Sequence, residues 1–163
     1  MTADTVVFEI GGVLVDWQPH LAWADDLGEN GTRVAQYIHR YTRTVPDKLS
    51  ATWDPLYALK DKDVTLHAIT DWSAEKWPEG LKVQPKLGEV FGTTVMPDEL
   101  CVLKPSTKIG KTLCTHAKVP SDQCVYIDDG LHNCLGARAA GVDAIHFTNA
   151  ADLRAGLNER ALL

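Results

Sequence analysis

The sequence has no long hydrophobic run and no concentration of positive charge. No apolar stretch approaches the about 18 residues that a membrane-spanning helix needs, and the early acids Asp4 and Glu9 argue against an N-terminal signal peptide. The net charge is −6 without a Lys/Arg cluster, whereas nucleic-acid binding requires clustered cations that neutralise phosphates. We therefore expect a cytoplasmic protein that binds neither membranes nor nucleic acid.

Cysteine is also scarce, and its spacing excludes two common roles. The cysteines form no C-x-x-C pair, which argues against a structural zinc site and against a small disulfide scaffold. We expect free thiols in a reducing compartment, at Cys101, Cys114, Cys124 and Cys134.

The remaining composition is that of an ordinary globular domain. The chain has 163 residues, 45% of them hydrophobic and 23% charged, which fits one domain, residues 1–163, with a sizeable core. Five short apolar segments have the length and composition of strands. They lie at residues 5–10, 64–70, 92–96, 124–128 and 143–147.

Helical patterns lie between and after the strands. They cover residues 105–118, 133–141, where Gly141 is placed to end the helix, and 151–163. The alternation of strands and helices predicts an α/β fold with a parallel sheet covered on both faces. Residues 20–62 have helical periodicity and no strand signal, so we interpret them as a small helical insert after the first strand.

Polar residues stand where three of the predicted strands end. Glu9, Thr70, Asp71, Asp128 and Asp129 occupy these positions. In parallel sheets, ligands bind beyond the carboxyl ends of the strands. Acids gathered there would raise one another's pKa unless a cation balanced them, and Mg²⁺ prefers such oxygen ligands. The pattern indicates a magnesium site at this edge.

Neighbouring residues could complete an anion site. Gly11 and Gly12 allow a tight turn with exposed N–H groups, Lys104 adds a positive charge, and Thr70 adds a hydroxyl donor. Plainer roles remain open: a strand-end carboxylate bound by backbone N–H groups, an acidic turn that caps a helix, and a solvated lysine.

Four segments together carry a family resemblance. They resemble, in order, the four motifs of the haloacid dehalogenase-like hydrolases: "VVFEIGGVLVDW", "LHAITDWSAEKWP", "LKPSTKIGKTL" and "CVYIDDGLHNCLGARAAGVDAIHF". The resemblance implies a Rossmann-like three-layer α/β/α sandwich with a five-stranded parallel sheet in the order 5-4-1-2-3. It also implies Mg²⁺-dependent hydrolysis through a covalent carboxylate intermediate. The substrates are usually phosphate monoesters and, in one branch, 2-haloacids.

The resemblance assigns roles to the strand-end residues. The catalytic positions are those of Glu9, which takes the place of the nucleophile, Thr70 and Lys104. The phosphate-binding positions are Gly11, Gly12, Thr70, Asp71 and Lys104, and the Mg²⁺ positions are Glu9, Gly11, Asp128 and Asp129.

The sequence departs from the family pattern in four places. Glu9 stands where the nucleophilic aspartate is usual, and Gly11 where many family phosphatases have a second aspartate as general acid. Asp71 follows Thr70 where an asparagine is common, and the insert at residues 20–62 is short for a helical cap. These departures leave three hypotheses: a phosphatase of small phosphorylated molecules, a catalytically impaired binding or regulatory relative, and, more weakly, a 2-haloacid dehalogenase.

A short cap leaves the site open to water, to larger substrates, or to closure by a second copy of the chain in a homodimer. Trp17, Trp23 and Trp53 could form an apolar wall or a dimer patch, but we expect them to pack between cap and core.

Overall fold

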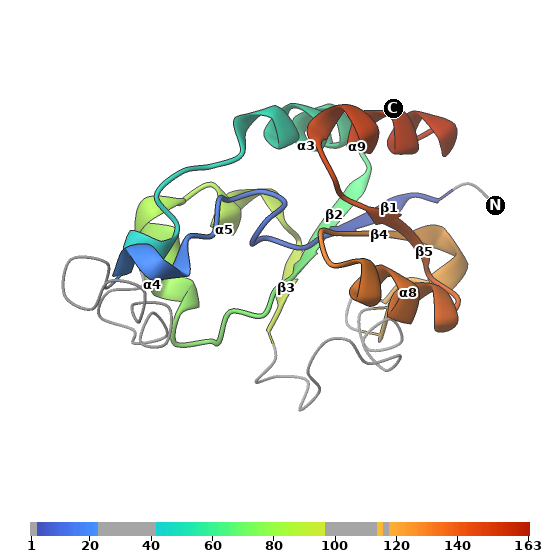
Figure 1. Ribbon diagram of the computed structural model, residues 1–163. Helices are drawn as coiled ribbons and strands as arrows, with labels where there is room; N and C mark the ends of the chain where they lie inside the picture. Colours follow the sequence, from blue (N-terminus) through green and yellow to red (C-terminus); the bar gives the residue numbers. More distant parts are fainter. Residues whose placement is uncertain (1–2, 23–41, 97–113, 116–117) are drawn as a thin grey trace.

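The sheet has the predicted number and order of strands. The structure is a computed structural model that describes residues 3–22, 42–96, 114–115 and 118–163. Its five parallel strands lie in the order β3-β2-β1-β4-β5, which is the predicted order (Figure 1). They are β1 (Thr5–Phe8), β2 (Thr65–Ile69), β3 (Thr93–Val95), β4 (Cys124–Asp128) and β5 (Asp143–His146). Each lies within the segment predicted for it.

The two central strands are buried on both faces. All four residues of β1 and all five residues of β4 are buried, which explains why these segments are continuously apolar rather than alternating. Side chains of β1 alternate between two cores: Val6 and Phe8 join one hydrophobic cluster, and Val7 joins the other.

Helices cover both faces of the sheet, which gives the predicted three-layer α/β/α sandwich. Helices α3 and α9 pack against each other on one face, and α8 packs against β4 and β5 on the other (Figure 1). The described helical segments are η1 (Pro19–Ala22), α3 (Ser50–Asp61), α4 (Trp77–Val83), α5 (Leu87–Val90), η4 (Ser121–Gln123), α8 (Leu131–Ala139) and α9 (Ala150–Glu159).

Two local features set the start of α9 and the end of α8: an asparagine cap and a glycine in the left-handed conformation. Asn149 caps α9 by accepting a hydrogen bond from the Asp152 N–H at 2.9 Å, and Leu153 and Leu157 are fully buried on the inner face. Just beyond α8, Gly141 has φ +84°, the left-handed conformation that glycine adopts without strain.

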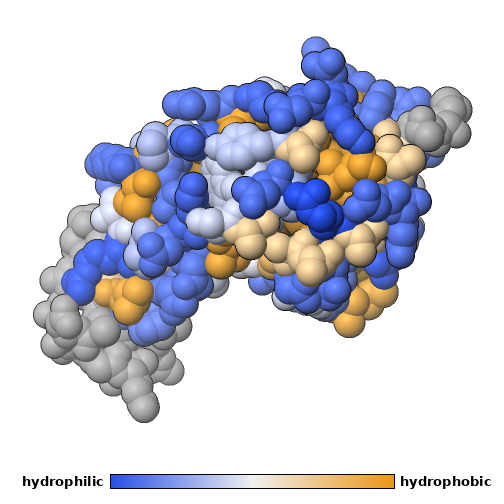
Figure 2. Space-filling view, turned by 90° about the horizontal axis from the view of Figure 1, so that it is seen from above, coloured by the Kyte–Doolittle hydropathy of each residue, from blue (hydrophilic) through white to orange (hydrophobic). Residues whose placement is uncertain are grey.

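Figure 2 shows mainly hydrophilic residues on the side seen from above, with hydrophobic residues in smaller patches.

The range predicted as a cap insert, residues 20–62, contains a helix of the core layer. In α3, Trp53, Leu56 and Leu59 are buried in the same cluster as the sheet residues. The cap insert at residues 20–62 stays a prediction. Residues 23–41 and most of the predicted helix 105–118 lie outside the described residues.

The described cysteines are free, as expected. Cys114, Cys124 and Cys134 are all buried, and Cys101 lies outside the described residues. Within the part of the chain that the structure describes, no helix has the length and apolar character needed to cross a membrane.

Candidate active site

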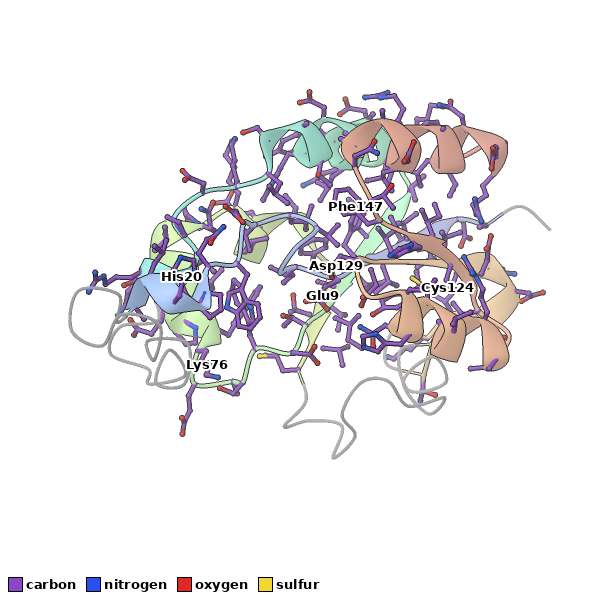
Figure 3. The ribbon with its side chains drawn as sticks, viewed as in Figure 1. Glu9, His20, Lys76, Cys124, Asp129 and Phe147 are labelled. Carbon is purple, nitrogen blue, oxygen red and sulfur yellow. The ribbon has the colours of Figure 1, made fainter. Side chains whose placement is uncertain are left out.

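The parallel register brings the predicted strand-end residues to one edge of the sheet. Phe8 pairs with Ile127 of β4 and with Ala68 of β2, so the next residue, Glu9, lies level with Asp128. The Glu9 N–H donates to the Ile127 carbonyl at 2.8 Å, which extends the ladder to this residue. Figure 3 labels Glu9 and Asp129, which lie at the same edge of the sheet, and Cys124 at the other end of β4.

The Glu9 carboxylate is buried in the turn that follows β1. The residue is 5% exposed, and its Oε1 accepts a hydrogen bond from the Gly11 N–H at 3.2 Å. One carboxylate oxygen is therefore directed toward the glycine turn, as the plainer interpretation of this acid anticipates. Burial and this contact hold Glu9 at the position that the family resemblance gives to the nucleophile.

Asp128 is anchored by three donors. The residue is fully buried, its Oδ1 accepts from the Gly130 N–H at 2.7 Å and from Asn133 Nδ2 at 2.9 Å, and its Oδ2 accepts from the Tyr126 hydroxyl. Burial and the charge of Asp128 raise the pKa of Tyr126 well above its ordinary value, so this phenol stays protonated and donates. The carboxylate is thereby held in one orientation.

Asp129 is exposed and packs on the glycine turn. A Cβ atom added to Gly12 would lie 2.3 Å from Asp129 Oδ2, and Gly12 has φ +77°. Glycine is therefore needed here both for the backbone conformation and for the close approach of the carboxylate. The Asp129 carbonyl also hydrogen-bonds to His146 Nε2 at 3.0 Å, which links the segment after β4 to the end of β5.

Thr70 and Asp71 follow β2 at the same edge. Thr70 is 1% exposed, and its Oγ1 accepts from the Trp72 N–H at 3.3 Å. Partial burial raises the pKa of Asp71, and the charges of Asp128 and Asp129 raise it further. Asp71 therefore lies within electrostatic range of Asp128, at the end of β4, and of the following Asp129, as expected if these acids share one site.

The structure adds positioning residues that the sequence reasoning missed. Tyr126 and Asn133 hold Asp128, and Trp72 lies beside the Glu9 turn with its Nε1 3.7 Å from the point that a Cβ on Gly11 would occupy. The sequence carries a signal for Asn133, because an asparagine in the first turn of a helix after a strand can reach back to the strand end. Tyr126 and Trp72 have no comparable signal.

The donor set fits a hard cation. Carboxylate oxygens gather around the edge, and the buried Oδ1 of Asn133 has no hydrogen-bond partner among the described residues. Among those residues, no three His, Cys, Asp or Glu side chains converge on one metal position. Mg²⁺ is usually bound through one or two carboxylates together with waters and substrate oxygens, so such convergence is not required. Lys104, predicted for the same site, lies outside the described residues.

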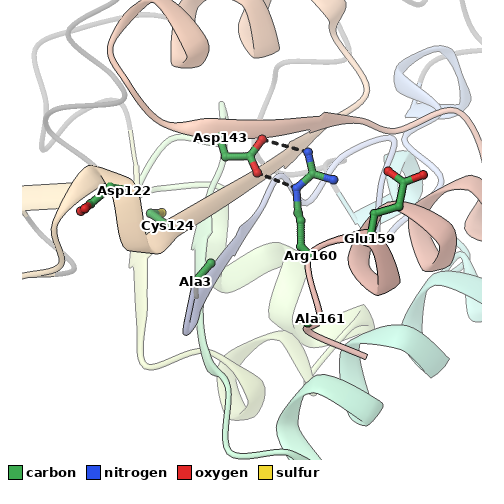
Figure 4. A pocket seen from close by; sticks show the side chains of 7 residues that line it. All are labelled: Ala3, Asp122, Cys124, Asp143, Glu159, Arg160 and Ala161. Carbon is green, nitrogen blue, oxygen red and sulfur yellow. Dashed lines mark hydrogen bonds and ion pairs between the residues drawn. The ribbon is translucent and has the colours of Figure 1, made fainter. Parts of the chain in front are cut away.

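A separate hollow lies at the opposite edge of the sheet. It measures ≈ 380 Å³ and is lined near the amino ends of β4 and β5 by Cys124, Asp143, Arg160 and neighbouring residues (Figure 4). Arg160 donates from Nε and NH2 to the two oxygens of Asp143 at 2.6 and 2.9 Å. This pair lowers the pKa of Asp143, which is an ordinary effect of a surface ion pair.

Solved structures share this fold at low sequence identity. A hydrolase from Streptococcus pneumoniae TIGR4 superposes with a TM-score of 0.74 at 16% identity, covering 97% of this chain and 100% of that chain. A HAD family hydrolase from Deinococcus radiodurans R1, solved with phosphate and sodium, gives 0.73 at 17% identity, covering 99% and 98%. A HAD family enzyme from Bacteroides thetaiotaomicron, solved with magnesium, gives 0.71 at 16% identity, covering 91% and 94%.

Sequence comparison identifies the family. No curated protein matches the chain. A family model described as haloacid dehalogenase-like hydrolase matches residues 24–147. This range includes Thr70, Asp71, Asp128 and Asp129 and begins after Glu9. By this match, and with the fold and strand-edge residues described above, the chain belongs to the haloacid dehalogenase-like hydrolases.

Proposed function

We propose that the protein is a Mg²⁺-dependent phosphatase that acts on a small phosphate monoester. The observation that carries the proposal is the register of the sheet, which sets Glu9 level with Asp128 at the carboxyl edge. Two of the similar solved structures were determined with magnesium or with phosphate, which agrees with the proposal.

In the proposed reaction, a Glu9 oxygen attacks the phosphorus atom and the bond to the substrate oxygen breaks. The leaving oxygen takes its proton from solvent water, because Gly11 supplies no general acid. Water then cleaves the resulting acyl phosphate, which releases phosphate and restores the carboxylate. The Thr70 hydroxyl would hold a phosphate oxygen. The N–H groups of Gly11 and Gly12 donate to Glu9 Oε1 and to the Val15 carbonyl, so they would have to exchange these acceptors to bind phosphate. Lys104 is proposed to balance the charge of the phosphate.

The metal is proposed to bind through Glu9, Asp128, Asp129 and a backbone oxygen of Gly11. When bound, Mg²⁺ would neutralise charge on the phosphate and lower the repulsion between the acids. Tyr126, the Gly130 N–H and Asn133 already orient the Asp128 carboxylate, so little further side-chain entropy would be lost when the ion binds.

A second candidate is a binding or regulatory protein that keeps the site without turnover. It is favoured by the hydrogen bond that the Gly11 N–H donates to Glu9 Oε1, because this bond engages an oxygen that would have to attack. Glutamate is one methylene longer than aspartate, and misplacing the nucleophile by about 1 Å can cost about 10²-fold in rate. Gly11 also offers no general acid.

Turnover of the purified full chain separates the two candidates. With Mg²⁺, p-nitrophenyl phosphate and a panel of sugar phosphates, a phosphatase should show activity that Glu9→Gln abolishes and that the exposed control Glu89→Gln retains. A flat result for the native chain, with activity appearing in Glu9→Asp, would assign it to the second candidate. Chloride release from 2-chloropropionate tests the dehalogenase alternative in the same preparation.

Metal binding can be tested without turnover. Millimolar Mg²⁺ should raise the melting temperature because it binds only the folded state. Asp129→Asn should reduce this rise more than Asp152→Asn, which changes an exposed acid at the start of α9. An unchanged melting temperature in the native protein would contradict the proposed site.

A further inference from the structure

A half-exposed tryptophan stands beside the Glu9 turn. Trp17 is 50% exposed, and it is one of three large hydrophobic residues that are exposed in the described part of the chain. The other two, Leu131 and Leu135, lie on α8. A single exposed apolar side chain is ordinary on a protein surface, so what distinguishes Trp17 is where it lies relative to the site.

Three side chains surround the space that Gly11 leaves empty. A Cβ atom added to Gly11 would lie 3.7 Å from Trp17 Cβ, 3.7 Å from Trp72 Nε1 and 3.9 Å from Glu9 Oε1. The proposed nucleophile, the Trp72 indole nitrogen and the Cβ atom of Trp17 therefore lie around one point. A group attached to a phosphate beside Glu9 would begin next to the base of the Trp17 side chain.

The backbone under Trp17 is held on both sides. The Asp16 N–H donates to the Asp47 carbonyl at 2.9 Å, and the Gln18 N–H donates to the Thr44 carbonyl at 2.7 Å. Gln18 Nε2 also donates to both carboxylate oxygens of Asp16 at 2.9 Å. Trp17 therefore stands on a fixed support although half of its side chain is exposed.

Trp72 forms a rigid inner wall. It is 5% exposed, and its six-membered ring covers Gly80 so closely that a Cβ there would lie 2.4 Å from Trp72 Cζ3. Its ring also contacts that of Trp77, with the centroids 6.0 Å apart and a tilt of 52°. The buried indole is thereby fixed, and the exposed Trp17 is the one with surface left for a ligand.

We infer that Trp17 is a specificity-determining residue that stacks on the leaving group of the substrate, and that the preferred substrates are phosphate monoesters of planar aromatic alcohols. This inference rests on the proposed phosphatase function. A planar ring can cover the indole face in offset or edge-to-face contact, whereas a saturated ring of the same size covers it less completely. Trp17 acts by positioning and takes no part in bond breaking.

The test compares phenyl phosphate with cyclohexyl phosphate, which differ in planarity at nearly equal size. Phenol is intrinsically the better leaving group, so the quantity to measure is the change in the phenyl-to-cyclohexyl ratio of kcat/KM between variants. Trp17→Ala should lower this ratio by roughly 2- to 12-fold, the range that one aromatic pair supplies. Trp17→Phe should retain most of it, and Leu135→Ala, which removes a similarly exposed apolar side chain, should leave it unchanged.

If the enzyme turns over both substrates and Trp17→Ala leaves the phenyl-to-cyclohexyl ratio of kcat/KM unchanged, the inference is overturned and the proposed function stands. Absence of turnover on any phosphate overturns the proposed function, and binding of the corresponding phosphonates, followed by calorimetry, then decides the inference. Weaker binding of phenylphosphonate to Trp17→Ala, with cyclohexylphosphonate unaffected, supports stacking. Equal effects on the two phosphonates overturn it.

Discussion

Replacing Gly12 by alanine should damage both stability and the metal site, because two separate features forbid a side chain there. The residue has φ +77°, and a residue with a Cβ atom in the left-handed region costs about 1–2 kcal/mol. The added carbon would also lie 2.3 Å from Asp129 Oδ2, so that carboxylate must move. The adjacent Gly11 provides a matched control, since a Cβ there meets only ordinary contacts at 3.7–3.9 Å.

The expected effect is measurable by thermal and urea unfolding. A loss of about 1–2 kcal/mol in a domain of this size lowers the melting temperature by roughly 2–8 °C. Gly11→Ala should be neutral or slightly stabilising, because alanine reduces the conformational freedom of the unfolded chain. The rise in melting temperature on adding Mg²⁺ should also be smaller in Gly12→Ala than in Gly11→Ala, because Asp129 is displaced only in the former.

Equal unfolding curves for the two alanine variants would refute this reasoning. They would show that the turn relaxes without cost and that the close contact between Gly12 and Asp129 has no energetic weight. A loss of stability with an unchanged response to Mg²⁺ would refute the second half alone, by separating the conformation of the turn from the position of the carboxylate.

Two further predictions concern buried polar groups. Asn133→Ala removes a hydrogen bond to the buried Asp128 carboxylate and should lower the free energy of unfolding in urea by about 1.5–3 kcal/mol. The control Asn158→Ala, on the exposed face of α9, should lower it much less. Equal losses would contradict the role of Asn133 in holding Asp128. Burial lowers the pKa of His67 below its ordinary value of 6.5. As the pH falls, the unfolded chain therefore binds a proton at this residue before the folded chain does. The free energy of unfolding should keep its full value above about pH 6.5 and decrease below it. His67→Leu should flatten this dependence between pH 7.5 and 5.5, and an identical slope in the variant would exclude His67 as its source.

The sheet could be predicted because strand composition and strand ends carry independent information. The apolar segments identify the strands, and the family resemblance gave an order that the structure confirms. The carboxyl edge then follows, since Glu9 and Asp128 each stand at the end of a buried parallel strand. Pairing of parallel strands converts such positions into spatial neighbours without any knowledge of side-chain contacts.

The surroundings of the site could not be predicted in the same way. From the sequence, Trp17 and Trp53 have the same expected role, packing between cap and core. Trp53 is 2% exposed and donates from Nε1 to the Leu14 carbonyl at 2.9 Å, whereas Trp17 is half exposed. The difference arises because Trp53 lies on the inner face of α3. Helical periodicity alone does not reveal which layer a helix joins, so it does not predict that α3 packs in the core.

The three donors around Asp128 have a consequence for the genetics of this site. A substitution at Asp128 leaves buried partners unsatisfied, so a variant such as Asp128→Ala reports on folding and on chemistry at once. The exposed Asp129 can change with far less disturbance of the interior. Loss-of-function screens would therefore assign greater importance to Asp128 for reasons of protein abundance. Asp129 variants that accumulate to normal levels would isolate the contribution of this acid to the proposed metal site.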